Sequence, residues 1–263
     1  MKNGPCYFFG RSGNVSRMLS GRMVALFLDF DGTLAPIQQD PARCVLSGEA
    51  RELLQRLADS GRHFVTVLSG RGFSDVKSKV GIRNICYGGN HGLVISGKGM
   101  AFVHPGALYA RPVIDKAGRR LGKEIAGFAG AWVERKKFSL SLHYRLADKK
   151  DVSKIKKAFY RVATEFSGAG PLAVLEGKKV FELMPDISWD KGNAALWILD
   201  RLADGYLPVF VGDDVTDEAA FRALKERGVT VRVGRSKRTS ARFYLKDYKE
   251  TRRLLKSISL PPA

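Results

Sequence analysis

Apolar runs and helix-like segments alternate along the first part of this 263-residue chain. Residues 24–29 (VALFLD) and 63–68 (HFVTVL) are nearly continuous apolar runs, which is typical of strands buried on both faces. Between them, residues 47–60 carry Ala and Leu at helical spacing and end before Gly61. A short helix over 72–80 and a third strand over 82–87 complete this third of the chain.

The last third repeats the pattern. We expect a helix over 191–202, a strand over 207–211, a helix from residue 217 and a strand over 229–233. Strands that alternate with helices predict a parallel sheet with right-handed crossovers.

The pattern differs in the middle of the chain. Residues 131–145 alternate apolar and polar side chains, as half-buried antiparallel strands do. A helix over 149–167 and two short strands over 172–175 and 179–183 are expected to follow. This block therefore predicts an α+β insertion into an α/β chain.

The predicted fold class is α/β, with a Rossmann-like parallel-sheet core and a smaller inserted α+β domain. We expect the core to comprise residues 23–108 and 186–263, and the inserted domain to comprise residues 109–185. Residues 1–22 precede the first clear strand, so we expect them to form a loose N-terminal arm.

Composition narrows the class of protein. With 44% hydrophobic residues, the chain can bury a sizeable core and is not of the disordered type. The three cysteines Cys6, Cys44 and Cys86 are widely spaced, which favours neither a disulfide framework nor a zinc site. Because no apolar run approaches the roughly 18 to 20 residues needed to span a bilayer, we expect a cytoplasmic protein without membrane association.

The charge is strongly basic, since 45 Lys and Arg oppose 26 Asp and Glu to give +19. Residues 222–263 contribute 13 basic and 3 acidic side chains to this excess. A basic surface is found in nucleic-acid-binding proteins and also around sites for anionic substrates. No nucleic-acid-reading motif accompanies it, so we do not expect a nucleic-acid partner, although a non-catalytic protein that binds RNA or anionic membrane stays an alternative.

Acidic residues follow two of the predicted strands. Asp29 and Asp31 end the first strand in the sequence DFDGT, where Gly32 permits a turn. Asp213 and Asp214 end the strand over 207–211. Because the carboxyl ends of parallel strands share one edge of a sheet, these carboxylates could jointly bind a hard divalent ion such as Mg²⁺.

Asp217 has two interpretations of equal weight: a member of this acidic cluster, or a first-turn acid that caps the following helix. Ser69, Gly70 and Arg71 follow the second strand and could face an anion. Lys191 begins a predicted helix and could balance the carboxylates.

Together these motifs resemble the haloacid dehalogenase superfamily of phosphohydrolases, with DFDGT, Ser69, Lys191 and the GDD at 212–214 in the family order. The inserted domain, which the resemblance identifies as a cap, and its surroundings narrow the resemblance to the trehalose-6-phosphate phosphatases. The motifs are GNHG at 89–92, VERK at 133–136, HYR at 143–145 and GKKVFE at 177–182. One departure is Leu183-Met184-Pro185, where the family commonly has an Arg-Pro pair after the glutamate.

The resemblance implies a Mg²⁺-dependent phosphatase that converts trehalose 6-phosphate to trehalose and phosphate in trehalose biosynthesis. Phosphatases of the same superfamily that act on sucrose phosphate or a glycosyl-glycerate phosphate are the nearest alternatives. We expect a monomer that binds this small-molecule substrate.

Site residues follow from the motifs and the resemblance. Asp29 is the expected nucleophile and Asp31 the expected general acid and base, with Ser69 and Lys191 cradling the phosphate. The expected metal ligands are Asp29, Asp31, Asp213 and Asp214. The expected substrate-binding residues are Gly70, Arg71, Asn90, His91, Glu134, Lys136, Arg145, Lys178 and Glu182.

Overall fold

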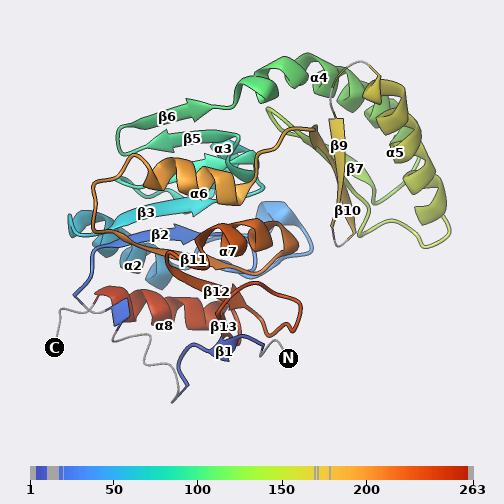
Figure 1. Cartoon of the computed structure of the whole chain (residues 1–263). Helices are drawn as coiled ribbons and strands as arrows, with labels where there is room; N and C mark the ends of the chain where they lie inside the picture. The colour runs from blue at the N-terminus through green and yellow to red at the C-terminus, as the bar shows by residue number, and fades with distance from the viewer. Residues whose placement is uncertain are drawn as a thin grey trace. The chain divides into compact units, whose positions relative to one another are not determined.

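The computed structural model describes residues 4–10, 18–19, 21–168, 170, 172–177 and 179–259. The chain divides into two compact units, Met1–Phe102 with Trp189–Ala263, and Val103–Ser188. We call these the first unit and the second unit. The second is inserted between the two segments of the first, as the colours of Figure 1 show.

A nine-stranded sheet runs through the first unit in the order β1-β13-β12-β11-β2-β3-β4-β5-β6. Its strands are β1 (Cys6–Tyr7), β2 (Val24–Leu28), β3 (Phe64–Leu68), β4 (Cys86–Gly89), β5 (Val94–Gly97), β6 (Met100–Val103), β11 (Leu207–Gly212), β12 (Val229–Val233) and β13 (Phe243–Leu245). Neighbours from β1 to β4 pair in parallel, whereas β4 and β5 pair antiparallel. The structure confirms the predicted α/β class.

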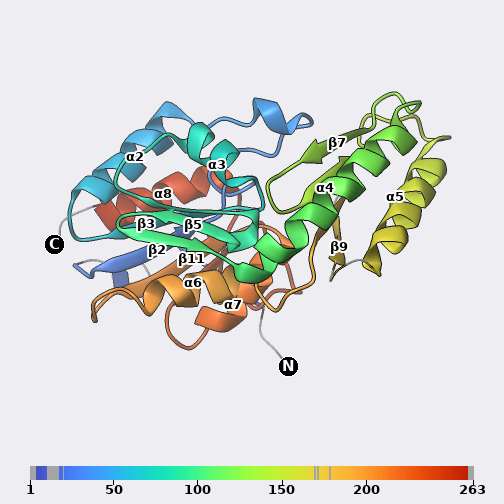
Figure 2. The ribbon, with the colours of Figure 1, turned by 90° about the horizontal axis from the view of Figure 1, so that it is seen from above.

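Helices cover both faces of this sheet (Figures 1 and 2). They are α2 (Gly48–Asp59), α3 (Phe73–Val80) and α8 (Tyr248–Ser259) on one face, and α6 (Lys191–Leu199) and α7 (Glu218–Leu224) on the other. The alternation of β2 explains the two layers, because Val24, Leu26 and Leu28 pack with the first group, whereas Ala25 and Phe27 pack with the second. Every residue of β2 is buried, as its continuous apolar sequence predicts.

The topology places two distant segments side by side. In the register of β2 and β11, Leu28 lies opposite Val211, and the backbone N–H of Asp29 donates to the Val211 carbonyl at 2.9 Å. Because the two strands are parallel, the residues that follow them leave the sheet at the same edge.

The second unit has its own sheet and its own core. Strands β7 (Trp132–Arg135), β8 (Leu140–His143), β10 (Val180–Pro185) and β9 (Leu172–Gly177) pair antiparallel in that order. Helices α4 (Pro105–Ile125) and α5 (Val152–Ser167) lie beside this sheet in Figure 2. Their apolar stripes pack against one of its faces. The other face carries polar side chains, as the period-two alternation predicts.

The N-terminal segment differs in part from the expected loose arm. Cys6–Tyr7 pairs in parallel with β13, and Phe8 is fully buried in the core of the first unit. The apolar sequence CYFF explains this packing, because burial of a Phe side chain contributes roughly 2 kcal/mol. Residues 1–3, 11–17 and 20 of this segment lie outside the described residues.

The basic C-terminal stretch contributes a helix to the core rather than only a charged tail. α8 buries Thr251, Leu254, Leu255 and Ile258 and directs its Lys and Arg side chains away from that stripe. Among the helices that the structure describes, none has the length and apolarity needed to cross a bilayer.

Candidate active site

Three carboxylates meet at the edge where β2 and β11 end. Asp29 follows β2, Asp213 follows β11, and Asp217 ends the short 3-10 helix η3 (Val215–Asp217). One oxygen from each lies within 4.8 Å of the others. Gly32 makes this approach possible, since its φ is 82° and a Cβ there would lie 2.2 Å from Asp213 Oδ2.

Lys191 provides the positive charge of this cluster. Its Nζ lies 2.7 Å from Asp29 Oδ1 and 2.7 Å from Asp217 Oδ1, and the side chain is 2% exposed. Its position is fixed by the start of α6, where the Asp190 side chain accepts from the backbone N–H groups of Gly192 and Asn193. Asp217 is thus a buried partner of Lys191 rather than only a cap.

Charge in the cluster is only partly compensated. Burial, opposed by Lys191, raises the pKa of Asp29 well above its ordinary value. Burial and the charge of Asp217 raise the pKa of Asp213 to about 7. Burial lowers the pKa of Lys191, but Asp217 and Asp29 outweigh it, so this pKa is raised. Three carboxylates and one ammonium group leave a formal charge of −2 when all are ionised, which suits a divalent cation with oxygen ligands.

We expect the metal-free protein to lose stability between pH 6 and pH 8. A carboxyl whose pKa is higher in the folded than in the unfolded state favours folding while protonated, and this contribution is lost as the pH rises through about 7 for Asp213. The loss is about 1 kcal/mol over this interval, or roughly 3 °C in Tm. Thermal unfolding in EDTA at several pH values measures it. In Asp213→Asn, Tm should decrease less between pH 6 and pH 8. An equal decrease in both proteins would contradict the raised pKa of Asp213.

Ser69 and the GNHG sequence form a second part of this edge. Ser69 is 1% exposed, and its hydroxyl accepts from the backbone N–H of Arg71 at 3.1 Å. After β4, the 3-10 helix η2 (Asn90–Gly92) packs against this loop: Asn90 N–H donates to the Arg71 carbonyl and His91 N–H donates to the Ser69 carbonyl. A Cβ on Gly70 would lie 2.6 Å from His91 Cε1, so only glycine fits here without a shift.

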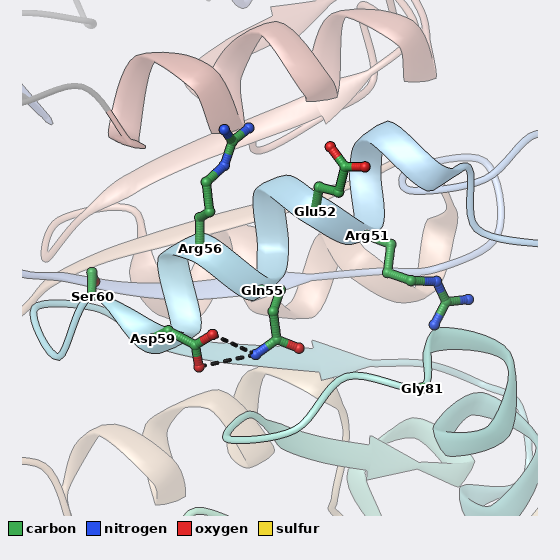
Figure 3. A pocket seen from close by; sticks show the side chains of 7 residues that line it. All are labelled: Arg51, Glu52, Gln55, Arg56, Asp59, Ser60 and Gly81. Carbon is green, nitrogen blue, oxygen red and sulfur yellow. Dashed lines mark hydrogen bonds between the residues drawn. The ribbon is translucent and has the colours of Figure 1, made fainter.

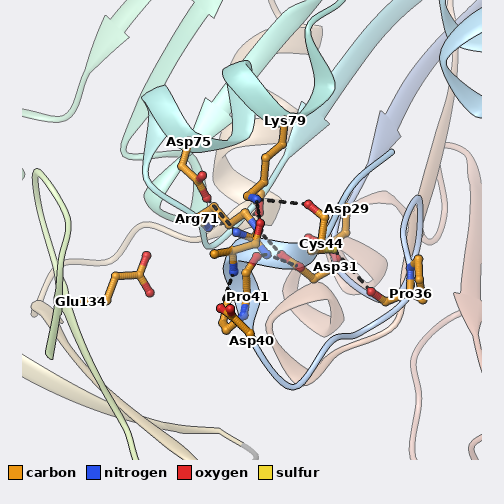
Figure 4. Close-up of polar contacts among 12 residues, drawn as sticks. Asp29, Asp31, Pro36, Asp40, Pro41, Cys44, Arg71, Asp75, Lys79 and Glu134 are labelled. Atoms are coloured by element: carbon orange, nitrogen blue, oxygen red, sulfur yellow. Dashed lines mark hydrogen bonds and ion pairs between the residues drawn. The ribbon is translucent and has the colours of Figure 1, made fainter. Parts of the chain in front are cut away.

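The side chain of Asp31 contacts Arg71, whereas that of Asp29 contacts Lys191. Both of its carboxylate oxygens accept from Arg71, as Figure 4 shows, and Arg71 is also bound by Asp75 on α3. Asp214 is exposed, and its backbone N–H donates to Asp217 Oδ2 at 2.9 Å. Within the described residues, the group of carboxylates that could hold a metal comprises Asp29, Asp213 and Asp217 and does not include the side chains of Asp31 or Asp214.

Polar residues of the second unit gather on the open face of its sheet. Glu182 is 8% exposed and accepts from Lys136 Nζ at 3.0 Å and Ser139 Oγ at 2.6 Å. Glu134 lies 2.8 Å from His143 Nε2. Burial raises the pKa of Glu134, but His143 and Lys136 outweigh it, so this pKa lies below its ordinary value.

Two further residues of the second unit were expected to bind the substrate. Arg145 lies two residues after β8 and is half-buried. Lys178 lies outside the described residues. His143, whose ring stacks on Trp132 at a centroid distance of 4.7 Å, was not among the expected site residues.

A separate surface pocket of about 660 Å³ lies along α2 (Figure 3). The residues that line it include Gln55 and Asp59, which hydrogen bond to each other at 2.9 Å. None of its lining residues belongs to the carboxylate cluster, so this pocket is separate from the candidate active site.

The parallel sheet with carboxylates at its carboxyl edge is the fold of the haloacid dehalogenase-like hydrolases. A structure of such a hydrolase from Bacteroides thetaiotaomicron has the same fold, with a TM-score of 0.63 at 15% identity over 90% of this chain and all of that one. The structure of a trehalose-6-phosphate phosphatase related protein gives a TM-score of 0.78 at 26% identity, covering 89% of this chain and 96% of that one.

Residues 27–249 match the family described as Trehalose-phosphatase, and the chain belongs to this family. It is 38% identical over 218 residues to a trehalose-phosphate phosphatase of Mycobacterium tuberculosis, which is 81% of this chain and 54% of the relative. It is 33% identical over 260 residues to a trehalose 6-phosphate phosphatase of Zea mays, with 91% and 70% coverage. The chain thus spans about half the length of the mycobacterial relatives it matches.

Proposed function

We propose that this protein hydrolyses trehalose 6-phosphate to trehalose and phosphate. The observation that carries the proposal is the buried Asp29 carboxylate, held 2.7 Å from Lys191 Nζ at the carboxyl edge of the sheet. A fixed carboxylate beside a cation can act as a nucleophile toward an anionic phosphate, because the cation offsets the repulsion between the two anions. Family membership and the names of the relatives support the substrate.

In this mechanism Asp29 attacks the phosphorus and forms an aspartyl-phosphate, while the sugar oxygen leaves with a proton from Asp31. Water then attacks the phosphorus, the bond to Asp29 breaks, and Asp31 takes the proton of the water. Lys191, Ser69 and the backbone N–H groups beside Ser69 stabilise the charge on the phosphoryl oxygens.

Asp29, Asp213 and the backbone carbonyl of Asp31 would hold Mg²⁺. Asp217 would fix Lys191 beside these ligands, and Asp214 would lie next to Asp213. When bound, Mg²⁺ supplies the positive charge that the cluster lacks. The raised pKa of Asp213 supports this assignment, since it reflects carboxylates that are buried close together without enough compensating charge.

The polar face of the second unit would hold the sugar through Glu134, Lys136, Arg145 and Glu182. Lys178 is a further proposed sugar-binding residue, by the resemblance to the family alone. Carboxylates accept from sugar hydroxyl groups and ammonium groups donate to them, so side chains of both signs suit such a ligand. Asn90, His91 and Gly70 would line the phosphate edge of the first unit.

We expect phosphate release from trehalose 6-phosphate in the presence of MgCl₂ and its loss, by at least about 100-fold, in excess EDTA. Free phosphate is measured in parallel with sucrose 6-phosphate, a glycosyl-glycerate phosphate and p-nitrophenyl phosphate. The trehalose ester should have the highest kcat/KM. A higher value for another sugar phosphate would reassign the substrate, and the absence of release from every ester would refute the proposed phosphatase.

A further inference from the structure

Arg71 holds both carboxylate oxygens of Asp31. Its Nε lies 2.6 Å from Asp31 Oδ2 and its Nη2 lies 2.6 Å from Asp31 Oδ1 (Figure 4). A planar guanidinium that binds both oxygens fixes the orientation of the carboxylate as well as its position. The Arg71 side chain is only 9% exposed, so this pair is part of the edge of the sheet rather than a surface contact.

The remaining side of the guanidinium is also engaged. Nη1 donates to Asp75 Oδ2 at 2.7 Å, Nη2 donates to the Pro41 carbonyl at 2.9 Å, and the group lies 5.4 Å from the centre of the Phe30 ring. These contacts use four of the five N–H hydrogens of Arg71. In this arrangement Arg71 has little capacity to bind an incoming phosphate, which is the role that the motif first suggests.

The pairing leaves Asp31 able to act as a base. Each oxygen accepts one N–H hydrogen from Arg71 and keeps a further lone pair, which can take a proton from water while both contacts to Arg71 are kept.

We propose that Arg71 and Asp75 are positioning residues that hold Asp31 as the base for hydrolysis of the aspartyl-phosphate. This rests on the proposed function. In that step a water oxygen bonds to phosphorus, the bond between phosphorus and the Asp29 oxygen breaks, and Asp31 takes the proton of the water. Asp75 acts through Arg71, because it fixes the guanidinium from the side opposite Asp31.

The test is the variant Asp75→Ala, whose carboxylate is 42% exposed and is therefore removed without opening the core. We expect kcat to fall by about 10-fold or more for both trehalose 6-phosphate and p-nitrophenyl phosphate, and to become the same for the two. Both esters form the same phosphoenzyme, so slower hydrolysis of that intermediate must limit them equally. Rapid acid quenching should show a larger fraction of the enzyme as phosphoenzyme than in the wild type.

Glu49→Ala is the matched control. Glu49 is also an acid in the first turn of a helix, is 44% exposed and accepts from Arg252 at 2.7 Å, but it lies on α2 away from the Asp31 pair. It should leave kcat and the phosphoenzyme fraction unchanged. Asp75→Glu should recover part of the lost rate, and Arg71→Lys, which keeps the charge without the two-point contact, should accumulate phosphoenzyme as Asp75→Ala does.

Two results would overturn the assignment while leaving the phosphatase intact. One is an Asp75→Ala variant indistinguishable from Glu49→Ala; the other is a loss confined to the sugar ester, which would place the pair in leaving-group protonation. A wild-type protein that releases phosphate without any phosphoenzyme would instead refute the covalent mechanism, and this proposal with it.

Discussion

Asp29→Asn should reduce phosphate release from every ester by about 10⁴-fold or more. An amide cannot form the phosphoryl-enzyme bond, whereas its shape and its carbonyl oxygen keep the contact with Lys191, which now lies 2.7 Å from Asp29 Oδ1. The substitution also removes one of three crowded carboxylates, so the fold should be retained. Phosphate release and thermal unfolding, measured on the same preparation, separate the two effects.

The control for this variant is Asp40→Asn. Asp40 lies in the loop that follows β2, and its exposed side chain accepts from the Ala42 N–H at the start of the 3-10 helix η1 (Pro41–Arg43). It should keep nearly all activity, because the amide can still accept that hydrogen bond. If Asp29→Asn released phosphate near the wild-type rate, the nucleophile would have to be another residue.

Lys191→Met should destabilise the fold by about 3–5 kcal/mol. The apolar side chain fills similar space, but it leaves Asp29 and Asp217 buried without the cation that each now contacts at 2.7 Å. A loss of this size corresponds to a decrease in Tm of roughly 10 °C for a chain of this length. Chemical denaturation followed by circular dichroism measures it. Activity should be lost as well.

Two further variants show whether charge compensation is the cause. Lys256→Met removes a lysine whose Nζ also lies 2.7 Å from a carboxylate, that of Glu49, but whose side chain is 57% exposed. This variant should change the free energy of unfolding by no more than about 1 kcal/mol. Lys191→Met combined with Asp217→Asn should recover part of the loss, because it removes one uncompensated carboxylate. Strictly additive losses in the double variant would show that packing rather than charge decides the stability here.

The elements that position the site were accessible from the sequence because their signals are local. β2, β3 and β11 are nearly continuous apolar runs, and a strand buried on both faces of a sheet removes all the side chains of such a run from water. Acidic residues directly after two of these runs then mark the carboxyl edge, and the parallel register brings Asp29 and Asp213 together.

Helices α4 and α8 were not predicted, because the amino-acid composition of each segment obscures its apolar helical pattern. α4 contains Pro112 and three glycines, which disfavour a helix interior, and four of its seven buried residues are Ala or Gly, which give little hydrophobic contrast. α8 lies in the most basic part of the chain, and its apolar stripe of two leucines and one isoleucine is narrow among many charged residues. In both, packing against a sheet outweighs intrinsic propensity.

Side-chain pairing in the site depends on contacts that sequence spacing does not encode. Asp217 could equally have been a cap, and only its burial against Lys191 distinguishes the two interpretations. Arg71 follows a motif that suggests phosphate binding, yet the turn after β3 directs it to Asp31 and Asp75. Both outcomes depend on which residues meet across the edge of the sheet.

The adjacency of β2 and β11 has a consequence for the biosynthesis of the protein. Lys191 and Asp29 are separated by 162 residues along the chain, and Thr33 and Asp213 by 180. A ribosome must therefore complete most of the polypeptide before Asp29 meets Lys191, whereas the inserted block, with its own core, can collapse earlier. Until that late pairing, a nascent chain carries no assembled carboxylate cluster.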